Sequence, residues 1–204
     1  MRLFAAVYPS AEAVAELGAL LGRSRTSTAG WQVRWAPADQ WHLTVAFFGE
    51  VPARALTDLS SRLARAAARA APASLSVGGL GAFPRRSGVG ATVLWAGLLG
   101  DLDGLRLLGR SVAAAGDRSI PGAGSGRSTH RFRPHITVAR CRSPGGADLS
   151  AMVAATADHV GPSWRVDSLV LVRSHLGAEV RHERIGAWPL GRVDTGLQHP
   201  DVSP

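Results

Sequence analysis

Two short segments of the 204-residue chain share one pattern: a histidine, an apolar residue, a threonine and a second apolar residue. They are His42-Leu43-Thr44-Val45 and His135-Ile136-Thr137-Val138. Side chains alternate between the two faces of a β-strand, so the histidine and the threonine of each segment share one face. Each segment is therefore predicted to be a strand that packs its apolar pair into a core and holds an imidazole and a hydroxyl on the other side.

Two such strands facing each other across a cleft would place two imidazoles on opposite sides of a small ligand. A neutral imidazole can take a proton from water and a protonated one can give a proton to a leaving oxygen, and the ordinary pKa of about 6.5 makes both forms available. The hydroxyls of Thr44 and Thr137 could donate hydrogen bonds to oxygens between the rings. The pattern therefore favours cleavage of a phosphate ester, but the spacing does not say which histidine is the acid.

Strands and helices are predicted to alternate along the chain. Strands are expected at residues 2–7, 32–35, 41–48, 74–77, 92–98, 135–139, 164–173 and 184–188. Helices are expected from a Ser10 cap onward, at 53–70, from an Asp101 cap to a stop at Gly116, and at 148–157. Gly78-Gly79 should end the fourth strand, residues 117–131 should form a long loop, and residues 191–204 should form a disordered tail.

The order of the expected elements repeats between the two halves of the chain. In each half a histidine-bearing strand leads to a helix, and that helix leads to another strand. We therefore expect one α+β domain over residues 1–190, made of two similar lobes that flank a central cleft. Each lobe should hold an antiparallel sheet with helices on its outer face, and the two motif strands should line the cleft.

The composition narrows the class of partner. The formal net charge is +8 and every basic residue is an arginine, which favours polyanions such as RNA, although heavy use of Ala, Arg, Gly and Val throughout the chain also accounts for arginine. The single cysteine, Cys141, cannot form an internal disulfide, and neither a secretory pattern nor a membrane-length apolar run is present. We expect a monomeric cytoplasmic protein that does not bind membranes.

No metal ion or other cofactor is expected. The sequence contains no His-x-x-x-His pair and no cysteine cluster, and no carboxylate lies beside either motif.

Three residues near the second motif are candidates for substrate binding. Arg140 lies five residues after His135, so an unbroken strand would turn it away from the imidazole and a bend would bring it round. Arg133 precedes the histidine by two residues. It shares the face of the histidine if the chain is extended there, but Pro134 lies between the two residues and disturbs a regular strand. Phe132 could stack on a nucleobase or pack in the core.

Other aromatic residues and histidines are expected to be structural. Phe48 could also stack on a base, but core packing is the favoured interpretation, and Trp41 should pack inward. His130 is close to the cleft in sequence. The remaining four histidines are expected at the surface, namely His159, His175, His182 and His199.

The chain resembles the two-histidine phosphoesterase superfamily, and within it the RNA 2′,3′-cyclic phosphodiesterases once called 2′-5′ RNA ligases. The resemblance covers about residues 2–190 and departs from the family at Phe48, where leucine is usual, and at the loop of residues 117–131. It rests, in family order, on Arg2-Leu3-Phe4-Ala5, Val33-Arg34-Trp35, His42-Leu43-Thr44-Val45-Ala46-Phe47-Phe48-Gly49-Glu50-Val51, Gly81-Ala82-Phe83-Pro84, Leu94-Trp95-Ala96-Gly97, Phe132-Arg133-Pro134-His135-Ile136-Thr137-Val138-Ala139-Arg140 and Val172-Arg173-Ser174.

The resemblance implies hydrolysis of RNA 2′,3′-cyclic phosphate ends to 2′-phosphomonoesters without a metal. In that scheme His42 is the general acid, His135 activates water, and Thr44 and Thr137 hold the phosphate oxygens. Arginine is frequent in the family at the position of Arg140. The alternatives are 2′-5′ RNA ligation, cleavage of small cyclic nucleotides or 2′-5′ linkages, and a non-catalytic module that only binds RNA ends.

Overall fold

The computed structural model describes residues 1–24, 32–84, 90–120, 133–143, 145–177 and 180–191. Its strands are β1 (Arg2–Val7), β2 (Val33–Trp35), β3 (Leu43–Glu50), β4 (Ala73–Phe83), β5 (Val93–Gly100), β6 (His135–Cys141), β7 (Ser163–Val166), β8 (Ser168–His175) and β9 (Arg181–Pro189). Its α-helices are α1 (Ala11–Ser24), α2 (Leu56–Arg69), α3 (Leu102–Ser119) and α4 (Ser150–Ala155), with 3-10 turns at Ala38–Gln40 and Ala53–Ala55.

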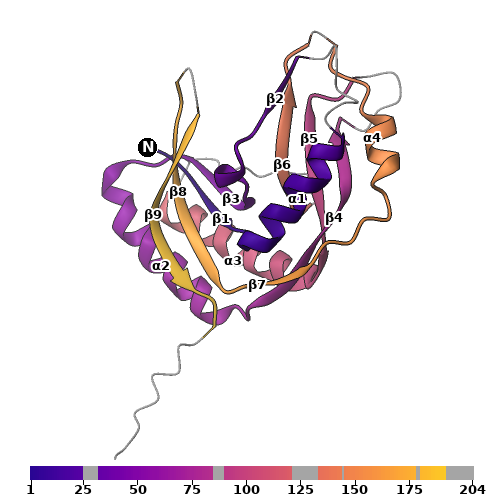
Figure 1. Cartoon of the computed structure of the whole chain (residues 1–204). Helices are drawn as coiled ribbons and strands as arrows, with labels where there is room; N and C mark the ends of the chain where they lie inside the picture. The colour runs from indigo at the N-terminus through magenta and orange to yellow at the C-terminus, as the bar shows by residue number, and fades with distance from the viewer. Residues whose placement is uncertain (25–31, 85–89, 121–132, 144, 178–179, 192–204) are drawn as a thin grey trace, which may run out of the picture.

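The strands form one sheet in the order β7-β4-β5-β6-β3-β1-β8-β9, and β2 pairs with β6. At the centre, the described part of the chain joins β3 to β6 through one residue pair, Leu43 with Ile136. The sheet is therefore two antiparallel halves that meet at one pair, with β1, β3, β8 and β9 in the first lobe and the other strands in the second (Figure 1). The predicted α+β fold with two lobes is confirmed.

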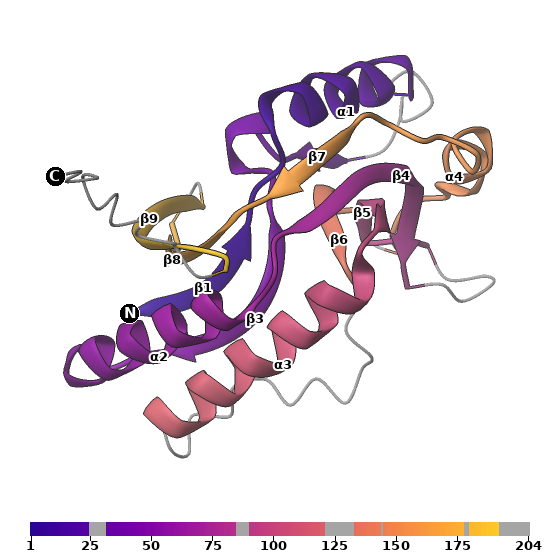
Figure 2. The same cartoon turned by 90° about the horizontal axis from the view of Figure 1, so that it is seen from below.

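The helices cover the outer faces of the two lobes. Helix α2 packs on β8 and β9, α3 packs on β3 and β4, and α1 and α4 pack on β4. Figure 2 shows α2 and α3 running along one side of the molecule while α1 lies on the other. Apolar residues of all four helices belong to a single core cluster that also contains Leu43, Ile136 and Val138. None of the described helices is long and apolar enough to cross a lipid bilayer.

After the exposed Arg2, strand β1 is buried on both faces, which explains its apolar sequence from Leu3 to Val7. Alternate residues of β1 belong to the main core. The residues between them face the other side of the sheet, where they start a second apolar cluster made of Phe4, Ala6, Val170 and Val172, with Tyr8 packed against it. The second cluster therefore lies on the side of the first lobe that also holds the histidine of the first motif.

Several predicted element bounds are confirmed. Strand β1 matches the predicted range, and the Ser10 Oγ accepts a hydrogen bond from the Ala13 amide at 3.2 Å, as a helix N-cap does. The predicted strand at 41–48 begins two residues later, at Leu43, so His42 precedes the strand. Most of the predicted loop at 117–131, and all but the first residue of the tail predicted at 191–204, lie outside the described residues.

The prediction that Gly78-Gly79 ends a strand is wrong. Strand β4 continues to Phe83, with a shift in its pairing to β5 between Val77 and Leu80. A Cβ on Gly79 would overlap the backbone of Thr156, at the end of α4, and the Thr156 Oγ1 accepts a hydrogen bond from the Leu80 amide at 3.1 Å. The glycines therefore allow an irregular strand to approach α4 closely.

The predicted ends of the third helix are also wrong in part. Helix α3 runs past Gly116 to Ser119, and Gly116 is buried in its last turn. Asp101 precedes the helix, but its side chain makes no cap hydrogen bond there. Its Oδ2 instead accepts a hydrogen bond from the Ser74 amide at 2.8 Å, which ties β4 to the start of α3.

The strand predicted at 164–173 is two strands with different partners. Strand β7 pairs with β4 in the second lobe, and β8 pairs with β1 in the first lobe. Asp167 lies between the two strands, where the chain crosses from one lobe to the other. A continuous run of strand-forming residues could not indicate this change of partner.

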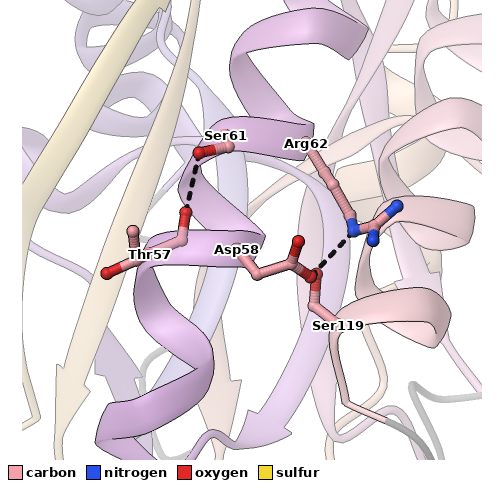
Figure 3. A network of polar contacts seen from close by, with 5 residues as sticks. All are labelled: Thr57, Asp58, Ser61, Arg62 and Ser119. Atoms are coloured by element: carbon pink, nitrogen blue, oxygen red, sulfur yellow. Dashed lines mark hydrogen bonds and ion pairs between the residues drawn. The ribbon is translucent and has the colours of Figure 1, made fainter.

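A polar network fixes α2 against the end of α3 (Figure 3). The Asp58 Oδ2 accepts hydrogen bonds from the Arg62 Nε at 2.8 Å and from the Ser119 Oγ at 2.7 Å. These two hydrogen bonds lower the pKa of Asp58. Because the folded-state pKa lies below the ordinary value, the contribution of this group to stability is present above that ordinary value and is lost as the pH falls through the folded-state pKa.

We predict that the central residue pair tolerates little loss of volume. Ile136 is fully buried, so Ile136→Ala should lower the free energy of unfolding by about 2–5 kcal/mol, whereas Ile136→Val should lower it by about 0.5–1.5 kcal/mol. Urea denaturation followed by circular dichroism measures both values. Equal values for the two variants would contradict the tight packing of this pair.

Candidate active site

The two motifs meet through a local two-fold arrangement. Leu43 of one motif pairs with Ile136 of the other in antiparallel register, and these are equivalent positions of the repeated pattern. Continuing the register places His42 opposite Thr137 and Thr44 opposite His135. Leu43 and Ile136 are buried, whereas the two histidines and two threonines are partly exposed. The sheet therefore brings both imidazoles and both hydroxyls to one face, as the alternation of the motifs predicts.

The two imidazoles are held in the same way. The His42 Nδ1 lies 2.6 Å from the carbonyl oxygen of Gln40, and the His135 Nδ1 lies 2.7 Å from that of Arg133. A carbonyl oxygen can only accept, so each Nδ1 carries the hydrogen. In each neutral ring, Nε2 is then the nitrogen with a free lone pair. Both rings can therefore use Nε2 to accept a proton or, once protonated, to donate one.

His42 sits among aromatic rings of the first lobe. It stacks on Phe4 with ring centroids 4.9 Å apart, and the rings of His182 and Tyr8 lie at 5.1 and 5.9 Å. The pKa of His42 is lowered to about 4, chiefly by burial and to a smaller extent by the charges of His182 and His135, while the hydrogen bond to Gln40 acts in the opposite direction. His42 is therefore neutral at pH 7 unless an anion lies beside it.

His135 has a different environment in the second lobe. Its ring meets the rings of Phe83 and Trp95 edge to face, with centroids 5.5 and 5.9 Å away. Trp95 pairs with Gly81 on β4, where any Cβ would overlap the indole. The glycine therefore leaves room for the tryptophan that packs against His135. Trp95 is buried, and its ring also contacts the site through His135.

Each motif strand contains a bulge just after the threonine. In β3 the pairing with β1 shifts so that Val45 has no partner, and in β6 the pairing with β5 shifts so that Val138 has none. An extra residue reverses the alternation of faces along a strand. The fifth residue after each histidine, Phe47 in β3 and Arg140 in β6, consequently returns to the histidine face.

Burial supports this assignment of faces. Phe47 is 56% exposed and its ring centroid lies 5.7 Å from that of Phe4, whereas Phe48 is buried in the core. In β6, Val138 and Ala139 are both buried and Arg140 is exposed. The sequence alone left open whether a bend turns Arg140 towards His135, and this bulge is that bend. Core packing of Phe48 is confirmed, and Phe47 is the aromatic residue that the sequence analysis missed.

Other predicted residues have mixed outcomes. Arg133 is exposed, and it contacts His135 through its backbone carbonyl. Phe132, His130 and His199 lie outside the described residues. Trp41 is buried, and its Nε1 donates a hydrogen bond to the Ala36 carbonyl at 3.1 Å, which confirms that it packs inward.

The surface position predicted for His182 is wrong. This β9 residue is partly buried, and its ring lies edge to face with both His42 and Phe4, at 5.1 Å in each case. Burial lowers its pKa. Next to it, the Arg184 guanidinium lies 3.9 Å above the Tyr8 ring. Nothing local in the sequence indicates these contacts, because they arise when β9 folds back on β8.

The described residues contain no group of three or more His, Cys, Asp or Glu side chains arranged to hold a metal ion. The chemistry that this arrangement offers is proton transfer by two imidazoles, hydrogen bonding by two hydroxyls and charge stabilisation by Arg140. The aromatic rings around His42 in the first lobe lie beside these groups.

Comparisons with known proteins found a matching family model and related sequences. Residues 10–178 match the family model described as the 2′-5′ RNA ligase superfamily. An RNA 2′,3′-cyclic phosphodiesterase of Geobacillus stearothermophilus is 30% identical over 168 residues, 80% of this chain and 51% of that protein. One of Thermus thermophilus is 31% identical over 182 residues, 86% of this chain and 83% of that protein. The match thus spans about half the length of the Geobacillus relative.

The fold is also found among solved structures. A crystal structure of a Thermus thermophilus protein superposes with a TM-score of 0.76 at 27% identity, over 93% of this chain and 98% of that chain. The likeness therefore extends over both lobes.

We predict that His42 titrates far below the ordinary histidine range. Its pKa of about 4 lies below that of an unfolded histidine, so the unfolded chain binds more protons between about pH 4 and 6.5, and acidification through this range destabilises the fold. NMR titration of the imidazole nitrogens should show Nδ1–H and no protonation of His42 above about pH 5, with the His42→Gln spectrum providing the assignment. A midpoint near 6.5 in the free protein would contradict the burial of the ring among its aromatic neighbours.

Proposed function

Because the chain belongs to the 2′-5′ RNA ligase superfamily, we propose that it hydrolyses the 2′,3′-cyclic phosphate at the 3′ end of RNA to a 2′-phosphomonoester. The observation that carries this proposal is the pair of equivalent imidazoles that present Nε2 on one face of the sheet. The names of the Geobacillus and Thermus relatives point to the same activity.

In the proposed reaction, the Nε2 of His135 takes a proton from a water molecule whose oxygen attacks phosphorus. The bond from phosphorus to O3′ breaks, and the Nε2–H of His42 gives its proton to O3′. The ribose keeps the phosphate on O2′. The acid and base roles follow the family resemblance, since the two motifs hold their rings alike.

His42 must carry a proton to act as the acid, and in the free protein its pKa is about 4. The substrate supplies the missing stabilisation, because a phosphate anion beside the ring favours the charged form of histidine and raises its pKa. Protonation of His42 is then coupled to binding of the correct anion. Binding of the 2′-phosphomonoester product should therefore raise the pKa of His42 well above its value in the free protein, and titration of the complex measures that pKa.

The remaining groups bind the phosphate and the base. Thr44 and Thr137 donate hydrogen bonds to the non-bridging oxygens, and Arg140 stabilises the charge that grows on the pentavalent phosphorus. Phe47 offers an exposed ring on the same face, suited to stacking on the terminal nucleobase. Because one chain provides both motifs, the site needs no second copy, and we propose a monomer that acts in the cytoplasm.

We predict that either motif histidine is required for turnover. His42→Ala and His135→Ala should each lower kcat by about 10²–10⁴-fold, because each removes one proton transfer from the transition state. Phosphorus NMR of a cyclic-phosphate dinucleotide measures the rate and identifies the phosphomonoester. His159→Gln is the matched control, since the ion-pair partner of His159 is Glu16 of α1 and not a residue of either motif.

The same assay separates the alternatives. Near-normal turnover by either alanine variant would reject the paired mechanism. A protein that binds the cyclic end without opening it would be a recognition module, and formation of a 2′-5′ linkage from two RNA ends would indicate ligation.

We also predict that chelators leave the reaction unchanged. The proposed chemistry uses two imidazoles, two hydroxyls and a guanidinium, none of which requires a cation. Turnover measured before and after prolonged incubation with excess EDTA should agree, and recovery of a lost rate by one divalent cation would reject the metal-independent mechanism.

A further inference from the structure

Two arginines face each other on neighbouring strands beside the second motif. Arg34 of β2 is the direct partner of Arg140 of β6. Residues paired in this way point to the same side of a sheet. The neighbours of Arg34, Val33 and Trp35, pack against the main core. Arg34 therefore lies on the opposite face, which is the face of His135 and Arg140.

A third arginine extends this row away from the catalytic centre. Arg142 follows Arg140 by two residues, so the alternation of the extended chain returns it to the same face. It is exposed, and its amide donates a hydrogen bond to the Gln32 carbonyl at 2.8 Å, which keeps it beside the start of β2. At about 3.3 Å per residue, Arg140 and Arg142 are about 7 Å apart along the strand.

Among the described residues, these three cations have no carboxylate partner. In the part of the chain that the structure describes, no carboxylate lies within 4.0 Å of Arg34, Arg140 or Arg142. Two arginines on the outer helices do have such a partner, since Arg62 pairs with Asp58 and Arg106 pairs with Asp103. Like charges directly opposite each other on a sheet are unfavourable, so the Arg34–Arg140 pair is stabilised when each guanidinium has an anion of its own beside it.

The chemistry of the substrate identifies that anion. A 2′,3′-cyclic phosphate occurs only at the 3′ end of RNA, so every other phosphate of the strand lies on its 5′ side. The strand must leave the catalytic face in one direction. The row of arginines begins at the motif and leads outward along β6 and β2, with a spacing comparable to that of successive phosphates in an extended strand.

We propose that Arg34 and Arg142 bind the phosphodiester backbone of the nucleotides that precede the reacting end. This inference rests on the proposed function and deepens it, because it makes an RNA strand, rather than a free cyclic mononucleotide, the preferred substrate. Arg140 stays with the reacting phosphate, and Arg34 and Arg142 hold the phosphates that follow. Neither of these two arginines takes part in the chemical step.

The test compares two substrates with the same reacting group. Arg34→Gln, Arg142→Gln and the double variant are assayed on a hexaribonucleotide with a cyclic-phosphate end and on adenosine 2′,3′-cyclic phosphate. Each substitution should lower kcat/KM for the hexamer about fivefold to tenfold and leave kcat/KM for the mononucleotide unchanged. The control is Arg65→Gln/Arg110→Gln, which removes two exposed charges from α2 and α3 and should lower neither value beyond a small general effect.

Salt dependence gives a second readout. The slope of log(kcat/KM) against log[salt] for the hexamer should become shallower by about 0.7 for each arginine removed, as expected for lost phosphate contacts to a single strand. Equal losses on hexamer and mononucleotide, or no loss on the hexamer, would overturn the backbone site. Thermal melting of each variant confirms that the sheet is intact.

Binding measurements test the backbone site without depending on the proposed reaction. Fluorescence anisotropy with a labelled hexamer that ends in a 2′-phosphomonoester needs no turnover. If the wild-type protein opens neither cyclic substrate, the proposed function fails. Weaker, less salt-dependent binding by the double variant would still support the backbone site, and unchanged binding would reject it.

Discussion

The site depends on the antiparallel pairing of Leu43 with Ile136. Among the described residues it is the one ladder pair between β3 and β6, so it joins the two halves of the sheet, and both side chains are buried in the core cluster shared by the four helices. Because the paired residues occupy equivalent positions of two copies of one pattern, the pairing generates a local two-fold arrangement. The two imidazoles are consequently placed by the backbone of the sheet rather than by flexible loops.

That rigidity determines how the histidines can act. Each ring is fixed through a hydrogen bond from Nδ1 to the carbonyl of the residue two positions earlier, so Nε2 is presented without a choice of tautomer. The aromatic cluster around His42 then sets its charge, because burial opposes protonation. A group that is neutral when the site is empty and is protonated beside a phosphate anion is suited to donate a proton only when substrate is bound.

The sequence predicts the site better than its surroundings. The motifs predict the buried pair and the shared face of both histidines, since these follow from local alternation. The exposed Phe47 could not be predicted, because the unpaired Val45 reverses the alternation and no residue type marks a bulge there. His182 was missed because its contact with His42 depends on how β9 pairs with β8. Gly78-Gly79 was misinterpreted because glycine permits both a strand end and a close approach to a helix.

The bulges also explain how one pattern can support two different roles. In each motif strand, a bulge returns the fifth residue after the histidine to the histidine face. The two-fold similarity of the backbone therefore extends to Phe47 and Arg140. The side chains there break that symmetry. Beside the exposed Phe47 the first lobe has the buried ring of Phe4, and the proposed function stacks the nucleobase on Phe47. Beside Arg140 the second lobe has Arg34 and Arg142. A substrate with a base at one side and a chain of phosphates at the other therefore fits in one orientation. In the proposed mechanism, that orientation rather than the two similar imidazoles decides which histidine faces the leaving oxygen and which faces the attacking water.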